Sequence, residues 1–85
     1  MARSIRNLGY THLRESLIKA REDAGITQAE LAARLGRTQS FVSKYEQGVP
    51  RLDVIDFALV CHHLGVVPGD VLADLDVSVL PPRGR

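Results

Sequence analysis

The sequence predicts an all-α fold, a compact bundle of five short helices. Apolar residues recur at helical spacing along most of the chain, and no stretch gives a convincing strand pattern. Glycine and proline interrupt these runs often enough to keep the helices short. A chain of 85 residues, 45% hydrophobic and 25% charged, has the size and composition of one small globular domain.

The domain is predicted to span residues 11–75, between an N-terminal arm of residues 1–10 and a C-terminal tail of residues 76–85. Apolar residues at three- and four-residue steps predict one buried face of the first helix: Leu13, Leu17, Ala20 and Ala24. Gly25, directly after them, suits the left-handed residue that ends many helices.

Thr27 and Glu30 mark the start of the second helix. A threonine followed three residues later by a glutamate is the capping-box pattern, in which each side chain accepts a hydrogen bond from the other residue's backbone N–H. Gly36 ends this helix, and its buried residues are predicted to be Leu31, Ala32 and Leu35.

Thr38 is the predicted N-cap of the third helix, which runs from about Gln39 to Gln47. Gly48-Val49-Pro50 ends it, because proline cannot continue a helix and restricts the residue before it. One side of this helix carries Val42, Tyr45 and Glu46.

The fourth helix is predicted from about Asp53 to Leu64, and Gly65 closes it. Its apolar stripe contains Val54, Phe57, Ala58, Cys61 and Leu64. Pro68 suits the first turn of a short fifth helix, which extends to about Asp74. The apolar side of that helix contains Val71, Leu72 and Leu75.

The second and third helices form the most informative unit. Helices joined by a tight turn at Gly36 must cross steeply, and Ala32 is small enough to lie at their contact. Burying their apolar residues leaves one polar set on the solvent side of the third helix: Gln39, Ser40, Ser43 and Lys44. These side chains have the reach and chemistry to contact base edges and phosphates, although an ordinary solvated face has a similar composition.

The net charge is only +1, so bulk basicity does not indicate a non-specific coat for nucleic acid. The distribution is uneven, because residues 34–51 carry a net charge of +3 and residues 52–76 carry −5. Mere scatter of surface charge is the simpler alternative. The uneven distribution favours one face for a polyanion and another face for a different partner.

Residues 27–48 resemble the Cro/lambda-repressor-like (XRE) family of helix-turn-helix DNA-binding domains. The resemblance lies in Thr-Gln-Ala-Glu-Leu-Ala, the Leu-Gly turn and Ser-Lys-Tyr-Glu-Gln-Gly, and it extends from about Leu13 to Leu72. It implies a lambda-repressor-like fold, with the helix-turn-helix at the second and third helices, that binds double-stranded DNA.

The resemblance also implies which residues contact DNA. Gln39 would pair with adenine, and Lys44 would contact guanine or a phosphate. The full base-reading set would be Gln39, Ser40 and Lys44. The phosphate-binding set would be Gln28, Ser43 and Arg51, with Arg37 beside the turn as a further candidate. The start of the second helix favours an anion independently, through its backbone N–H groups and dipole.

Three further positions concern the third helix. Arg21 and Glu46 match a family ion pair that would hold the recognition helix in place rather than touch DNA. Phe41 departs from the small or polar residue that many relatives carry. It would either pack on a thymine methyl or sugar, or cover the edge of the second helix, and the sequence leaves both open.

Cys61-His62-His63 invites a metal interpretation, which helix geometry opposes. Successive helical residues point about 100° apart, so three in a row do not converge on one ion. No nucleophilic pair, phosphate loop or carboxylate pair appears either, so we expect neither an enzyme nor a cofactor. A single cysteine and no signal-peptide or membrane-span pattern predict a soluble cytoplasmic chain.

The fourth helix has a second apolar set outside its predicted core stripe, Ile55 and Leu59. The tail adds Val77, Val79 and Leu80, where a small domain should be ending. Scattered surface hydrophobes are normal, but these residues also suit a self-complementary patch. We expect a homodimer, because two-fold symmetry would place two recognition helices one DNA turn apart on a palindromic operator.

The function that follows is a stand-alone transcriptional regulator, a repressor that occupies promoter DNA. The alternative from another class is an antitoxin that binds a protein toxin through the exposed apolar residues and regulates its own operon. A third candidate function is that of a restriction-modification controller protein, a relative of similar size.

Overall fold

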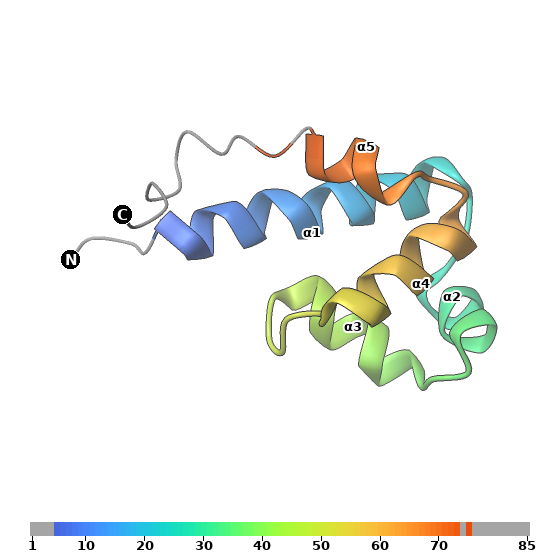
Figure 1. The fold of residues 1–85 in the computed structure, drawn as a ribbon. Helices are drawn as coiled ribbons and strands as arrows, with labels where there is room; N and C mark the ends of the chain where they lie inside the picture. The colour runs from blue at the N-terminus through green and yellow to red at the C-terminus, as the bar shows by residue number, and fades with distance from the viewer. Residues whose placement is uncertain (1–4, 74, 76–85) are drawn as a thin grey trace.

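The structure of the chain, a computed structural model, describes residues 5–73 and residue 75. It contains the five helices that the sequence predicts, so the all-α bundle is confirmed (Figure 1). They are α1 (Ile5–Asp23), α2 (Gln28–Leu35), α3 (Gln39–Gln47), α4 (Val54–Leu64) and α5 (Pro68–Ala73).

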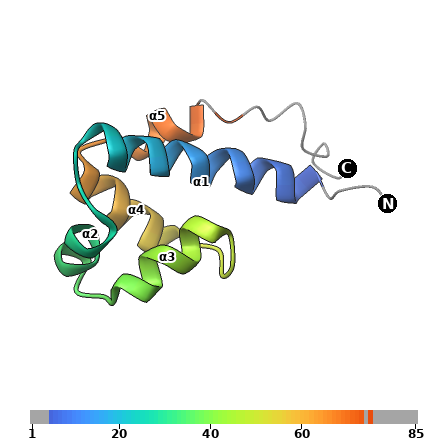
Figure 2. The same cartoon turned by 180° about the vertical axis from the view of Figure 1, so that it is seen from behind.

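The long helix α1 forms one side of the domain, and α5 lies against its C-terminal half (Figures 1 and 2). The α2–α3 pair lies on the opposite side, and α4 packs between this pair and α1. The core therefore forms where α1, α2, α3 and α4 face one another. Its fully buried side chains are Leu17, Leu31, Val42, Tyr45, Val60 and Cys61.

The ends of α2 and α3 follow the sequence signals closely. Thr27 and Glu30 form the predicted capping box, with hydrogen bonds of 2.9 and 3.0 Å. The Thr38 hydroxyl accepts the backbone N–H of Phe41 at 3.2 Å. Gly36, with φ of +68°, ends α2 in the left-handed region that a side chain disfavours. These caps fix the turn between the two helices.

Helix α1 begins at Ile5, so residues 5–10, predicted as part of an N-terminal arm, are helical. A contact far away in the sequence stabilises this extension, because the Tyr10 hydroxyl accepts the backbone N–H of Leu52 at 3.0 Å. At the other end, Ala24 lies beyond the last helical residue and is exposed, contrary to its predicted place on the buried face.

The buried stripe of α4 differs from the predicted one. Val54 is 74% exposed and Ala58 is also exposed, whereas Val60, which was not predicted, is fully buried. The observed stripe is rotated about the helix axis and contains Phe57, Val60, Cys61 and Leu64. Apolar residues occur on every side of α4, so the sequence pattern could not decide which side faces α1 and α2.

The short helix α5 buries Val71 as predicted, but Leu72 is 49% exposed, and Leu75 beyond the helix is half-buried. Asp74, the predicted end of this helix, lies outside the described residues. None of the helices in the described part of the chain is long and apolar enough to cross a membrane.

Candidate nucleic-acid interface

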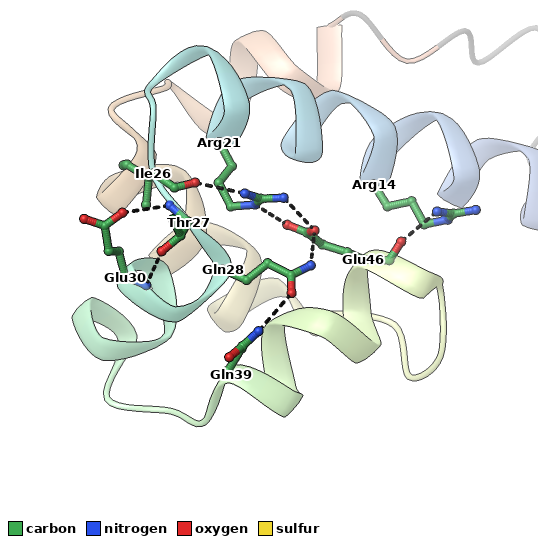
Figure 3. A network of polar contacts seen from close by, with 8 residues as sticks. All are labelled: Arg14, Arg21, Ile26, Thr27, Gln28, Glu30, Gln39 and Glu46. Carbon is green, nitrogen blue, oxygen red and sulfur yellow. Dashed lines mark hydrogen bonds and ion pairs between the residues drawn. The ribbon is translucent and has the colours of Figure 1, made fainter.

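An ion pair fixes α3 to α1 from the inside. Arg21 Nε and Nη2 donate to the two carboxylate oxygens of Glu46 at 2.7 and 3.1 Å, and Arg21 Nη1 donates to the Ile26 carbonyl at 2.9 Å (Figure 3). Only 12% of the Arg21 side chain and 6% of the Glu46 side chain are exposed. The hydrogen bonds to Glu46 raise the pKa of Arg21 above its usual value. This is the bidentate geometry in which a buried pair holds a fixed orientation.

The network continues from Glu46 to the start of α2. Gln28 Nε2 donates to Glu46 Oε1 at 2.9 Å, and Gln28 Oε1 accepts a longer contact of 3.4 Å from Gln39 Nε2 (Figure 3). Arg21, Glu46, Gln28 and Gln39 thus form one chain of polar contacts through three helices. It leads from the interior to the first residue of α3.

The outer side of α3 carries the predicted polar residues. Gln39, Ser40 and Lys44 are exposed, whereas Ser43 is half-buried. Ser43 Oγ accepts a hydrogen bond of 3.2 Å from Gln47 Nε2 one turn later. Opposite this face, Val42, Tyr45 and Glu46 are buried as predicted. Burial raises the pKa of the Tyr45 phenol far above its usual value, and the neighbouring Glu46 carboxylate adds to the shift.

Arg37, in the turn between α2 and α3, is held by two contacts. Its Nη1 donates to Asp56 Oδ1 of α4 at 3.2 Å, and its guanidinium carbon lies 3.8 Å from the centre of the Phe41 ring. Phe41 is half-buried against the core, with its ring 5.7 Å from that of Tyr45 in an edge-to-face arrangement. The sequence left two roles open for Phe41, contact with DNA or packing on the edge of the second helix. These contacts favour packing within the protein, and the observed neighbours are Arg37 and Tyr45.

Two residues that sequence reasoning missed lie where α3 ends. Arg14 of α1 donates from Nη1 to the backbone carbonyl of Glu46 at 2.7 Å (Figure 3). The ring centre of Tyr10 lies 5.2 Å from the Arg51 guanidinium carbon. Both contacts join residues more than 30 positions apart, and no local pattern signals them.

The residues predicted for a dimer are only partly described. Ile55 and Leu59 of α4 are 65% and 43% exposed, and exposed Val54 and Ala58 adjoin them on the same helix face. This apolar α4 face, Val54, Ile55, Ala58 and Leu59, is larger than the predicted pair. Val77, Val79 and Leu80 lie outside the described residues.

The rings of His62 and His63 lie edge to face, with their centres 5.1 Å apart. Cys61 is fully buried in the core, where burial raises the pKa of its thiol, and His62 is exposed. In the part of the chain that the structure describes, no group of three His, Cys, Asp or Glu side chains is placed to hold a metal ion.

Comparison with known proteins identifies the family of the chain. A family model described as a helix-turn-helix domain matches residues 12–75. The chain belongs to this helix-turn-helix family. A solved structure, described as an XRE-family like protein from Pseudomonas syringae pv. tomato str. DC3000, is 51% identical in sequence. The match has a TM-score of 0.82 and covers 91% of this chain and 93% of that chain. A comparison with curated proteins gives no match.

These matches confirm the predicted XRE resemblance and the lambda-repressor-like fold. The chain is a helix-turn-helix DNA-binding domain of the XRE family, a family that is typically non-enzymatic. In this domain α3 is the recognition helix, and its outer side is the surface that would meet the major groove.

Proposed function

We propose that this XRE domain is a transcriptional repressor that binds a palindromic operator as a homodimer. One observation carries the proposal most strongly. The exposed polar side of α3 is held in register by buried contacts from Arg21 through Glu46 to Gln28. Reading bases requires side chains held at fixed positions, which such directional contacts supply.

In this proposal the base readers are Gln39, Ser40 and Lys44. Gln39 uses one amide N–H toward Gln28, which leaves one N–H and its oxygen. Adenine needs one donor and one acceptor from a glutamine, so the contact to Gln28 orients the amide without occupying the groups that pair. Lys44 is exposed one turn beyond Ser40 and would contact guanine O6 and N7.

The proposed phosphate contacts surround this reading set. Gln28 donates one N–H to Glu46, and its second N–H remains to contact a phosphate at the start of α2. The Ser43 hydroxyl accepts from Gln47 and can still donate to a phosphate. Arg51 lies in the loop after α3. Arg37 would have to share its guanidinium between Asp56 and a phosphate.

The apolar α4 face supports the homodimer. Its three large hydrophobic side chains, Val54, Ile55 and Leu59, are exposed to solvent. Exposed apolar surface of this kind is common at interfaces between subunits. A two-fold axis through such a face would present two α3 helices to DNA. For half-sites one turn apart, their separation would be roughly 34 Å.

The same face also favours a second candidate, an antitoxin that holds a protein toxin against α4. A restriction-modification controller is the third. Binding to DNA does not separate these candidates. Co-purification of a second protein, or a neighbouring gene for a toxin or for a nuclease and methyltransferase, would separate them.

Selection from a random duplex library tests the proposal. We expect one enriched palindromic sequence with half-site centres about 10 base pairs apart, or a multiple of that spacing. Light scattering after size exclusion should give twice the 9.3 kDa of the chain at micromolar concentration. An enriched site without symmetry, or a 9.3 kDa species with and without DNA, would contradict the dimer and leave DNA reading intact.

A further inference from the structure

A groove of about 610 Å³ lies where the C-terminal half of α1 meets α5 and the segment that joins α4 to α5. Helix α5 lies against α1 here (Figures 1 and 2). None of the residues that line the groove belongs to α2 or α3. Its apolar lining residues are Ala20, Ala24, Leu64, Val66, Val67 and Val71.

The groove is an apolar surface connected to the core. Leu64 and Val71 are core residues, and Val66 packs against the core. Val67, in contrast, is 60% exposed, and Ala24 is exposed as well. Covering such a surface with another apolar segment removes it from water, which is favourable.

The charged residues of the groove favour a basic occupant. They are Lys19, Asp23 and Asp70, one positive side chain against two negative ones. Lys19 Nζ and Asp23 Oδ2 pair with each other at 3.1 Å. Within the described part of the chain, the Asp70 carboxylate has no ion-pair partner. One negative charge therefore remains uncompensated beside the apolar surface.

The chain itself carries a segment with matching properties, the tail segment of residues 77–85. It lies outside the described residues. Its sequence has apolar Val77, Val79 and Leu80, followed by Arg83 and Arg85. It contains no acidic residue, so its charge is +2. The tail segment is thus complementary to the groove in both hydrophobicity and charge.

The tail segment begins close to the groove. Val71 lines the groove, and Leu75, whose backbone N–H donates to the Leu72 carbonyl at 3.1 Å, is only four positions later. The groove follows α1 from Ser16 to Ala24, about 12 Å at the helical rise. Residues 77–80 in an extended conformation also span about 13 Å. A short tether gives an effective concentration in the millimolar range, which favours the chain's own segment over that of a second copy.

We propose that residues 77–80 dock into this groove of their own chain and that the arginines after them lie near Asp70. The inference does not rest on the proposed function, because neither α3 nor the apolar α4 face takes part. It assigns the apolar tail residues to the groove rather than to the homodimer, for which the apolar α4 face remains the proposed interface. A tail segment docked there would cover apolar surface and leave the outer side of α3 open to DNA.

A nitroxide spin label on the tail segment tests the inference in the full-length chain. Ser78→Cys provides the attachment site, because alternate residues of an extended segment point to opposite sides and Ser78 would point away from the neighbouring valines. Cys61 is fully buried, so its thiol should not react, and mass spectrometry checks that one label is present. The same chain after reduction of the nitroxide is the reference.

The readout is the intensity of backbone amide resonances near the label. We expect the resonances of Ala20, Ala24 and Val67 to lose most of their intensity, because these residues line the groove. The resonance of Ser40 on α3 should lose little. Equal losses over the whole domain, or no loss at the groove, would show that the tail segment does not dock, and the inference would fail while the proposed function stands.

Two exposed hydrophobic residues provide a matched pair of variants. Val67 and Leu72 are 60% and 49% exposed, but only Val67 lines the groove. In the labelled chain, Val67→Lys should restore the intensities of Ala20 and Ala24, whereas Leu72→Lys should leave them reduced. Asp70→Asn should restore them in part, because it removes the charge that attracts the two arginines. Equal behaviour of the two lysine variants would contradict docking in this groove.

Mixing two preparations identifies the chain that supplies the tail segment. Spin-labelled chains without isotope label are mixed with isotope-labelled chains that carry no nitroxide. We expect no loss of intensity at Ala20 or Ala24 in the mixture, because each groove holds its own tail segment. A loss in the mixture as large as that within one labelled preparation would mean that a second copy supplies the occupant, and would overturn the inference.

Discussion

The outer faces of α3 and α4 differ in chemistry although the two helices pack into the same core. On α3 the outer face is polar, and the inner face adds the charged Glu46 to apolar Val42 and Tyr45. On α4 the outer face is apolar, with Val54 and Ile55 in the open, and the buried residues are all apolar as well.

The contrast shows what each face requires. Apolar burial is non-directional, so it stabilises α4 without fixing the position of single atoms. The bidentate Arg21–Glu46 contact is directional and couples the orientation of α3 to α1. The proposed base-reading face of α3 would need a polar support of this kind behind it. The proposed protein interface on α4 would not need one.

The largest expected effect concerns that support. Arg21→Leu leaves the Glu46 carboxylate buried without its main partner, and should lower the free energy of unfolding by about 3–5 kcal/mol. Lys19→Leu is the control, because it breaks an exposed ion pair on the same helix and should cost no more than about 1 kcal/mol. Urea denaturation at pH 7 measures both.

The double variant that combines Arg21→Leu with Glu46→Leu should recover part of the lost free energy of unfolding, because neither charge is then buried without its partner. If Arg21→Leu costs as little as Lys19→Leu, the ion pair does not hold α3, and the contrast with α4 loses its physical basis.

The next effect concerns the apolar α4 face. Ile55→Lys should abolish self-association and reduce affinity for a duplex with two half-sites on the order of 100-fold, because binding of the second half-site is no longer assisted by the first. Affinity for a single half-site should not change. Light scattering and duplex titration measure the two quantities.

Val67→Lys is the matched control, since Val67 is 60% exposed and lies before α5 rather than on α4. An unchanged oligomeric state in Ile55→Lys would contradict a dimer that forms through the apolar α4 face.

A smaller effect separates anchoring from reading. Gln28→Ala should weaken binding to the selected duplex and to a shuffled duplex by roughly 1–2 kcal/mol, because a phosphate contact carries no sequence information. Fluorescence anisotropy at fixed salt measures the ratio of the two affinities. A further loss on the selected duplex alone would come from the Gln39 amide, which Gln28 no longer orients, and no loss on the shuffled duplex would contradict the phosphate contact.

The smallest effect tests the capping box that begins α2. Hydrogen bonds from the backbone and side chain of Thr27 lower the pKa of the Glu30 carboxyl below its usual value. A lowered folded-state pKa gives stability that is present above the unfolded value and lost as pH falls through the folded value. Wild type should therefore lose its small advantage over Glu30→Gln as pH falls from 5 toward 3.

Thermal unfolding at several pH values would detect this convergence of wild type and Glu30→Gln. A constant difference across the series would mean that the Glu30 charge contributes nothing to the cap.

The comparison also explains how much the sequence could predict. Helices α2 and α3 were predicted to the residue, because Thr27, Gly36 and Thr38 act through contacts within a few positions. In α4 the predicted start at about Asp53 lies one residue before the observed start at Val54, and Gly65 closes the helix as predicted, but the choice of Val54 over Val60 as a core residue was wrong. Only packing against the other helices decides that choice.

The same reason accounts for the residues missed at the candidate interface. Arg14 and Tyr10 gain their roles from Glu46, Leu52 and Arg51, all more than 30 positions away. Tyr10 also lay within the predicted arm, where no buried partner was expected. The family resemblance supplied the base-reading roles of α3 and the Arg21–Glu46 pair, whereas the extension of that pair through Gln28 to Gln39 had to come from the structure.

The central claim is that the outer side of α3 reads bases, and Lys44→Ala tests it most directly. Titration at fixed salt would compare the selected duplex with a shuffled one for wild type, Lys44→Ala and the charge control Lys19→Ala. We predict that Lys44→Ala loses about 1–3 kcal/mol on the selected duplex and little on the shuffled one, while Lys19→Ala changes neither appreciably. Wild-type affinity of Lys44→Ala for the selected duplex, or an equal loss on both duplexes, would contradict the claim.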